Sequence, residues 1–200
     1  TKPEITNIDT EIINYLYQYA EDNNQKITVY SEDNKTPRYS VVTDRGQGNP
    51  FLQYLQHYKL ISNKHIPFDY MFSNIESRLE LLAGLIDSDG SINNNTRFEI
   101  IQKSDILAEN IVTLARSCGL HVVATKKKSG IKKLNFEGVY NRIQISGDIL
   151  RIPVKIERKK PKERDCKRNT TYSAIKIEKD IVDNYYGFEI DGDNLFLLED

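Results

Sequence analysis

The chain contains few cysteines and histidines, and both shortages exclude common kinds of site. Cys118 and Cys166 are the only cysteines among 200 residues, and they lack metal-ligand spacing. This argues against a disulfide scaffold and against a zinc site, and it favours a reducing, intracellular compartment. The three histidines are scattered along the sequence, so a histidine metal cluster is not expected.

Long apolar runs are also absent. No stretch reaches the roughly 18 consecutive apolar residues that a membrane span needs, and no signal-peptide pattern is visible, so we expect no membrane partner. The apolar content of 38% is low for a globular protein. The apolar residues nevertheless recur at regular periods, which argues against disorder. The length allows one large domain or two small ones.

The net charge of −1 conceals an uneven distribution. Residues 121–170 contain fifteen Lys or Arg and five Asp or Glu, whereas the remainder contains thirteen and twenty-four. A basic block of this size indicates a polyanion-binding surface, although charge runs more commonly form a solvated face. Its alternating polar residues favour a strand ribbon that reads the major groove of DNA. The candidate DNA-binding residues are Arg97, Lys126, Lys127, Lys128, Lys132, Lys133, Arg142 and Gln144.

The most informative segment is residues 81–90, Leu-Leu-Ala-Gly-Leu-Ile-Asp-Ser-Asp-Gly. Its large aliphatic residues form a wide apolar helix face. Ala83 and Gly84 carry little bulk, so a second helix could pack closely against them. A capping box beginning at Ser77 predicts the start of this helix, and Gly90 is expected to end it in the left-handed conformation.

Two aspartates stand at the C-terminal end of this predicted helix. The helix dipole disfavours a carboxylate there by roughly 0.3–1 kcal/mol. Asp87 and Asp89 therefore suggest a bound cation, and an oxygen-only site with few protein ligands suits Mg²⁺. The alternative is a helix end with two solvated aspartates, which is the usual origin of an isolated Asp-x-Asp-Gly.

Periodicity predicts the same order of elements twice, as expected for an α/β chain with two repeats. The later unit follows residue 90, and the earlier one occupies the first seventy residues. A loop containing Ser129 and Gly130 is expected between the last two strands. The later elements are strands over 97–102, 121–125 and 139–146, a helix over 105–118 capped by Ser104, and a short helix from Asp148. The earlier elements are a strand over 4–6, a helix from Asp9 or Thr10 to Ala20, strands over 26–30 and 39–43, and a helix over 50–60.

Residues 81–90 resemble the signature of the LAGLIDADG homing endonucleases, with Ser88 in place of the usual alanine. A second segment, Asn63-Lys-His-Ile-Pro67, is similar to the Lys-x-Ile-Pro block that lies between the two motifs of this family. The resemblance is closest to the endonuclease regions of inteins. It implies two αββαββ repeats that form a saddle on double-stranded DNA with a long asymmetric site.

The resemblance also implies a site for metal-assisted phosphodiester hydrolysis. By position in the motif, Asp89 is the metal ligand, together with Gly90, and Asp87 serves the helix end. The lysine of the second block maps onto Lys64. For the matching lysine after the second repeat, Lys160 is favoured over Lys159. The implied cofactor is Mg²⁺, with Mn²⁺ as a substitute and no small-molecule cofactor.

The C-terminal tail resembles a second part of an intein. Residues 185–198 begin Tyr-Tyr-Gly-Phe and are similar to a splicing-domain block of inteins from nuclear genes and large DNA viruses, although a plain β-hairpin would also explain them. We therefore predict a first endonuclease repeat over 1–70, a second over 71–168, and a splicing-domain (Hint) β segment over 169–200. The implied location is the nucleus or cytoplasm of a eukaryotic or virus-infected host.

The first repeat departs from the family pattern. Its acidic motif helix would precede Glu4, so the chain is expected to bind DNA better than it cuts until a second acidic helix is supplied. The splicing nucleophile and the final His-Asn are absent, so it is not expected to splice itself. Three functions stay open: part of an intein homing endonuclease, a splicing fragment that assembles with an N-terminal intein fragment, and a non-catalytic nucleic-acid-binding module.

Overall fold

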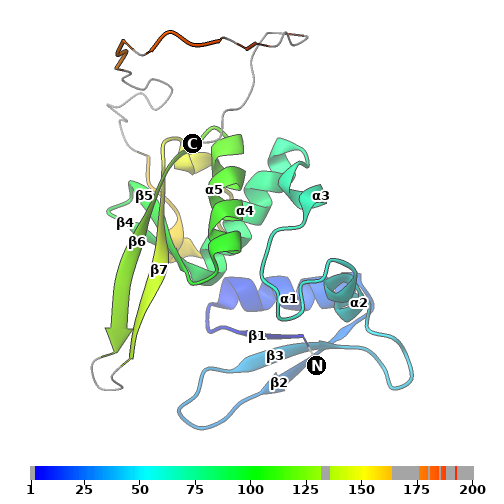
Figure 1. Cartoon of the computed structure of the whole chain (residues 1–200). Coiled ribbons are helices and arrows are strands. Elements are labelled where there is room, and N and C mark those ends of the chain that lie inside the picture. Colours follow the sequence, from blue (N-terminus) through cyan, green and yellow to red (C-terminus); the bar gives the residue numbers. More distant parts are fainter. Residues whose placement is uncertain are drawn as a thin grey trace.

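The computed structural model describes residues 3–131 and 136–163, together with residues 176–179, 181–184, 186–187 and 192. Lys132, Lys133 and most of the predicted splicing segment lie outside the described residues. Within the described part, no helix combines the length and apolar character needed to cross a membrane. The ordered elements form two sheets with helices packed on them (Figure 1).

The first half of the chain contains a small three-stranded antiparallel sheet in the order β1-β3-β2. Leu16, Tyr39 and Val41 form its buried core, with partly buried neighbours around them. The Asn49 side chain accepts a hydrogen bond from the Leu52 amide and so caps α2, whose first residue is Pro50. The elements are β1 (Glu4–Thr6), α1 (Thr10–Asp22), β2 (Lys26–Tyr30), β3 (Arg38–Val42), α2 (Pro50–His57) and α3 (Phe68–Met71).

The second half contains a four-stranded antiparallel sheet in the order β4-β5-β7-β6. Its larger core packs α4 and α5 on one sheet face, with Leu82, Ile86, Phe98, Ile111 and Ile143 fully buried. The elements are α4 (Ile75–Asp89), β4 (Gly90–Asn93), β5 (Arg97–Gln102), α5 (Asp105–Ser117), β6 (His121–Ile131), β7 (Phe136–Ser146), and the 3-10 turns η2 (Ile149–Arg151) and η3 (Glu157–Lys159).

The topology confirms the predicted mixed α/β fold and the duplication. In the first sheet β3 lies between β1 and β2, and in the second sheet β7 lies between β5 and β6. In each half the strand that precedes the long helix therefore pairs with the last strand of the unit. The second sheet has one further edge strand, β4, which continues directly from α4.

Three local predictions were wrong, each for a physical reason. Helix α4 begins at Ile75, because the Asn74 side chain accepts the Ser77 amide 2.8 Å away and so takes the capping position. Gly90 has an extended backbone (φ −92°) rather than a left-handed one. Ser129 and Gly130 lie within β6, because β6 and β7 continue as a two-stranded ribbon that projects from the molecule (Figure 1).

Candidate metal site and nucleic-acid interface

Asp89 is the last residue of α4, and its side chain is exposed to solvent. One carboxylate oxygen, Oδ2, accepts a hydrogen bond of 3.2 Å from Nε2 of Gln102 on β5. Gln102 is itself buried, on the inward side of β5 together with Phe98 and Ile100. A polar residue at an inward strand position is the signal in the sequence that marks Gln102. Gln102 fixes the orientation of the Asp89 carboxylate.

Gly90 is required by a close backbone approach. A Cβ atom at this position would lie 2.8 Å from Cα and 2.9 Å from the carbonyl oxygen of Ile86. These are backbone atoms, so they could not move aside cheaply. The glycine therefore lets α4 turn at once into β4, which keeps Asp89 at the junction of helix and sheet.

Asp87 has a different role from Asp89, although only two residues separate them. Its side chain is buried, and its two oxygens accept the backbone amides of Lys155 at 2.7 Å and Ile156 at 3.3 Å. Positions two apart on a helix point about 200° apart around its axis. Asp87 therefore holds the segment after η2, while Asp89 faces outward.

Lys159 is also buried against the end of α4. Its Nζ donates to the carbonyl oxygens of Ile86 at 2.8 Å and of Asp87 at 2.7 Å. These carbonyls belong to the last turn of the helix, where the final acceptors lack intrahelical partners, although the carbonyl of Ile86 also accepts a hydrogen bond from the Gly90 amide. Burial, and then the charge of Arg158, lower the pKa of Lys159 below its ordinary value.

Lys160, favoured from the sequence, lies elsewhere. Its exposed ammonium pairs with Glu157 at 2.6 Å, and this contact raises the pKa of Lys160. The structure thus brings Lys159 rather than Lys160 to the end of α4. A catalytic role for Lys160 stays a prediction.

Asp89 contributes a single carboxylate to any cation site. In the described ranges, no group of three or more His, Cys, Asp or Glu side chains is arranged to hold a metal ion. Mg²⁺ suits such a sparse site, because it retains several water ligands and is commonly bound by one or two carboxylates together with substrate phosphates. An exposed, oriented carboxylate such as Asp89 fits this requirement.

The second sheet has one face covered by helices and one open face. Inward residues of β5, β6 and β7, such as Ile100, Val122 and Ile145, are buried in the core. Side chains alternate along a strand, so their sequence neighbours point the other way. We call this surface the open sheet face; it contains Arg97, Glu99, Ile101, Val123, Thr125, Lys127, Tyr140, Arg142 and Gln144.

Three residues on the open sheet face form a hydrogen-bonded network. Arg142 contacts Oε2 of Glu99 through Nε at 2.8 Å and Nη2 at 2.6 Å. Gln144 donates to the same oxygen at 3.2 Å. The Arg142 contact is the main cause that holds the pKa of the Glu99 carboxyl below its ordinary value. Glu99 was not among the sequence candidates.

The predicted DNA-binding residues do not all share this face. Arg97, Lys127, Arg142 and Gln144 do, whereas Lys126 and Lys128 alternate to the helix side of the sheet. Lys126 pairs there with Asp105, the first residue of α5, at 2.5 Å. The hydrogen bonds from Lys126, and then from Asn141, lower the pKa of Asp105. The basic segment was predicted to form one surface. The alternation of side chains along β6 instead places its lysines on opposite sides of the sheet.

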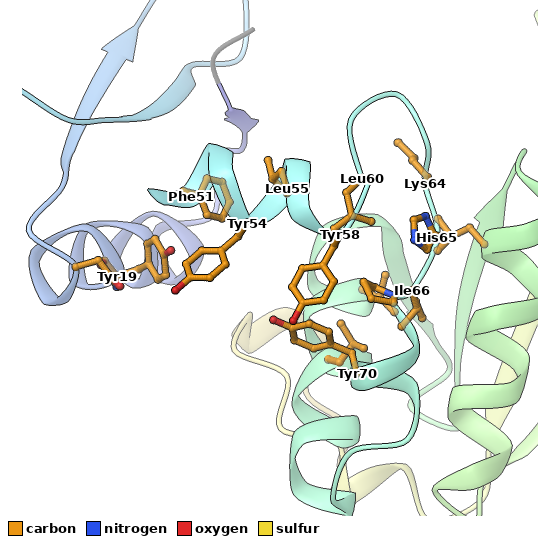
Figure 2. Close-up of a pocket in the computed structure, with 15 residues that line it drawn as sticks. Tyr19, Phe51, Tyr54, Leu55, Tyr58, Leu60, Lys64, His65, Ile66 and Tyr70 are labelled. Atoms are coloured by element: carbon orange, nitrogen blue, oxygen red, sulfur yellow. The ribbon is translucent and has the colours of Figure 1, made fainter. Parts of the chain in front are cut away.

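An aromatic pocket of about 620 Å³ lies between α1 and α2 on one side and α3 and α4 on the other. Figure 2 shows Tyr54, Tyr58 and Tyr70 in it, with Lys64 on the adjoining loop. The loop is anchored because Ile66 is buried and its amide donates to Asn110 of α5 at 2.9 Å. Lys64 itself is exposed.

A second pocket, of about 700 Å³, follows the other side of α4. Ala83, Gly84 and Asp89 line it, together with residues of β1 and α1. A Cβ atom at Gly84 would meet no described atom outside its own helix within 4 Å. Tyr70 and Leu81 line both pockets, so the two pockets adjoin at α4. Lys64 lines the first pocket and Asp89 lines the second.

Comparison with known proteins finds partial matches to this chain. Residues 65–156 match the family model described as homing endonuclease. A DNA polymerase of Thermococcus kodakarensis is 30% identical over 129 residues, which cover 64% of this chain and 6% of that protein. A replicative DNA helicase DnaB of Mycobacterium intracellulare is 32% identical over 69 residues, covering 34% of this chain and 12% of the helicase. The chain therefore spans only a small part of these relatives.

A solved structure also resembles the chain. The crystal structure of I-DmoI in complex with DNA and Mn has a TM-score of 0.49 and 17% sequence identity, and the match covers 72% of this chain and 73% of that one.

Proposed function

We propose that the chain binds a specific duplex DNA site and contributes one half of a Mg²⁺-dependent centre that hydrolyses phosphodiesters. The match of residues 65–156 to the homing endonuclease family model supports this proposal. The observation that carries this proposal is Asp89, an exposed carboxylate at the end of α4 whose orientation Gln102 fixes. Asp87 is buried and accepts the backbone amide of Lys155, so Asp89 is the aspartate of the motif that is left to bind a metal ion.

When bound, Mg²⁺, or Mn²⁺ in its place, supplies charge stabilisation at the scissile phosphate and a more acidic water. Asp89 would hold the cation with its carboxylate, and Gly90, whose backbone packs against Ile86, would keep Asp89 at the junction of α4 and β4. Lys64 and Lys160 are the proposed lysines that stabilise developing negative charge. The Lys159 contacts hold the last turn of α4 in place beneath Asp89.

A second acidic helix completes the centre. The second pocket supports this part of the proposal, because Ala83 and Gly84 line it and a Cβ atom at Gly84 would meet nothing outside its own helix within 4 Å. Close backbone packing of two helices requires such small residues.

DNA binds across the open sheet face and its counterpart in the first half. The two halves share topology but differ in their residues, which favours a long asymmetric site. Lys127 lies on the open face without the carboxylate contact that Lys126 has, so it suits a phosphate contact.

A second function, intein splicing, is favoured by the comparisons. The matched segment is a small part of long polymerase and helicase chains, as an element inserted in a host protein would be. In this view residues 169–200 form part of a splicing domain that assembles with an N-terminal intein fragment. A binding module without catalysis is the third candidate.

One experiment separates these functions. The chain is incubated with a random duplex library in Mg²⁺ and separately in Ca²⁺, with and without an N-terminal half that carries an acidic motif helix. We expect selective binding by the chain alone and staggered cuts in Mg²⁺ after the half is added. Ligation of flanking segments would support splicing instead, and binding without cuts would support the third function. Absence of selective binding would contradict the nuclease proposal.

Replacing Lys127 with glutamine should lower DNA affinity and its salt dependence. Each phosphate contact contributes about 0.9 to the slope of log affinity against log salt, so we expect the slope to fall by about one. The measurement is binding to one duplex between 50 and 200 mM salt, a range over which each phosphate contact changes the affinity by about three- to fourfold. Arg116→Gln on α5, which covers the opposite sheet face, removes the same charge and should leave the slope unchanged.

A further inference from the structure

We propose that Glu99 and Arg142, which form one hydrogen-bonded network with Gln144, read one G·C base pair in the major groove, and that Glu99 also positions Arg142. This inference rests on the proposed function, because it requires DNA on the open sheet face. It adds the chemical identity of one recognised base pair and a residue, Glu99, that the basic pattern of the sequence did not indicate.

The contacts orient the guanidinium of Arg142. Its Nε and Nη2 both donate to Oε2 of Glu99, at 2.8 Å and 2.6 Å. A guanidinium is planar and has five N–H donors in a fixed fork. Pairing along the Nε–Nη2 edge leaves the Nη1–Nη2 edge directed away from Glu99. That edge is the fork that donates to O6 and N7 of guanine.

The carboxylate contributes the complementary acceptor. Both Arg142 and Gln144 donate to Oε2 of Glu99, so its second oxygen, Oε1, remains for a further donor. In the major groove a G·C pair presents two guanine acceptors followed by the N4 amino donor of cytosine. The arginine fork and Oε1 match this order. An A·T pair presents acceptor, donor, acceptor, which the same three groups cannot satisfy.

The charge of the network favours a base edge over a phosphate. Arg142 and Glu99 neutralise each other, and a carboxylate close to the arginine would repel a phosphate oxygen. The Glu99 side chain is 14% exposed and that of Arg142 35% exposed, so the pair is fixed but accessible. Lys127 on the same face lacks such a carboxylate contact among the described residues and suits phosphate. A pair that only stabilised the sheet across β5 and β7 would not affect base preference.

The test is selection from a randomised duplex library by the full chain in Ca²⁺, followed by sequencing. We compare the wild type with Glu99→Gln, which keeps the shape but not the charge, and Arg142→Lys, which keeps the charge but not the fork. The wild type should enrich one invariant G·C pair by roughly 5- to 150-fold over other pairs, the range for one bidentate contact. Both variants should lose this preference at that position only. Lys127→Gln is the matched control and should weaken binding to all sequences while retaining the preference.

Two results would overturn the inference, and they are distinguishable. If the wild type enriches a motif and both variants enrich the same motif, Glu99 and Arg142 do not read a base, while the proposed function stands. If the wild type enriches no motif, the proposed function fails and this inference fails with it. Circular dichroism at the selection temperature verifies that each variant is folded. If the Glu99→Gln variant is unfolded, the base preference of the Arg142→Lys variant alone tests the inference.

Discussion

Replacing Asp89 with asparagine should reduce Mg²⁺-dependent cleavage at least a hundredfold while leaving DNA binding in Ca²⁺-free buffer nearly unchanged. Loss of a carboxylate ligand removes the charge that holds the cation. The cation stabilises the developing negative charge by several kcal/mol. A loss of about 2.7 kcal/mol of this stabilisation lowers the cleavage rate a hundredfold. Asparagine keeps an oxygen that accepts the hydrogen bond from Gln102, so the local geometry is retained.

The same substitution should not destabilise the protein. Asp89 is exposed and lies at the negative end of the α4 dipole, so removing its charge should be neutral or stabilise folding by about 0.3–1 kcal/mol. Cleavage is measured on the duplex recovered by selection, with the second acidic helix supplied, and stability by urea unfolding. Ser88→Ala, a change at the neighbouring exposed position, is the control and should retain cleavage. Cutting that survives in Asp89→Asn would show that the metal assignment is wrong.

Replacing Asp87 with alanine should lower the free energy of unfolding by about 3–5 kcal/mol, whether or not DNA is present. The substitution leaves the buried amides of Lys155 and Ile156 without their acceptors. It also removes a carboxylate whose charge favours the protonated form of buried Lys159. A loss this large is a substantial part of the 5–15 kcal/mol stability typical of a domain.

Equilibrium urea unfolding measures this loss. Ser88→Ala serves again as the control, because its exposed hydroxyl only donates to Leu85 within the helix, and it should change stability by less than about 0.5 kcal/mol. The loss of unfolding free energy in Asp87→Asn should lie between those of Asp87→Ala and Ser88→Ala, because the amide oxygen of asparagine can still accept one of the two backbone hydrogen bonds. A loss below about 1 kcal/mol in Asp87→Ala would mean that water replaces the missing acceptor.

The contrast between these two aspartates shows how far the motif could be interpreted from sequence. The motif predicted a helix that ends in an acidic pair and a glycine, and it favoured Asp89 over Asp87 as the ligand. The structure explains the difference, because the helical period turns one side chain into the core and the other outward. The predicted reason for the glycine, a left-handed backbone that ends the helix, was wrong. Gly90 is extended and allows a close approach to the Ile86 backbone.

The sequence alone determined the local elements and their repetition, because helix and strand periods, caps and turn residues act within a few positions of the chain. Strand Arg97–Gln102 and the Ser104 cap of α5 were predicted as observed. Tertiary structure decided which lysine reaches α4, since Lys159 contacts carbonyls 72 and 73 residues earlier. It also decided that Glu99 orients Arg142 across two strands, and that Lys126 and Lys127 face opposite sides. Contacts over such separations depend on strand register and chain path, which no local pattern encodes.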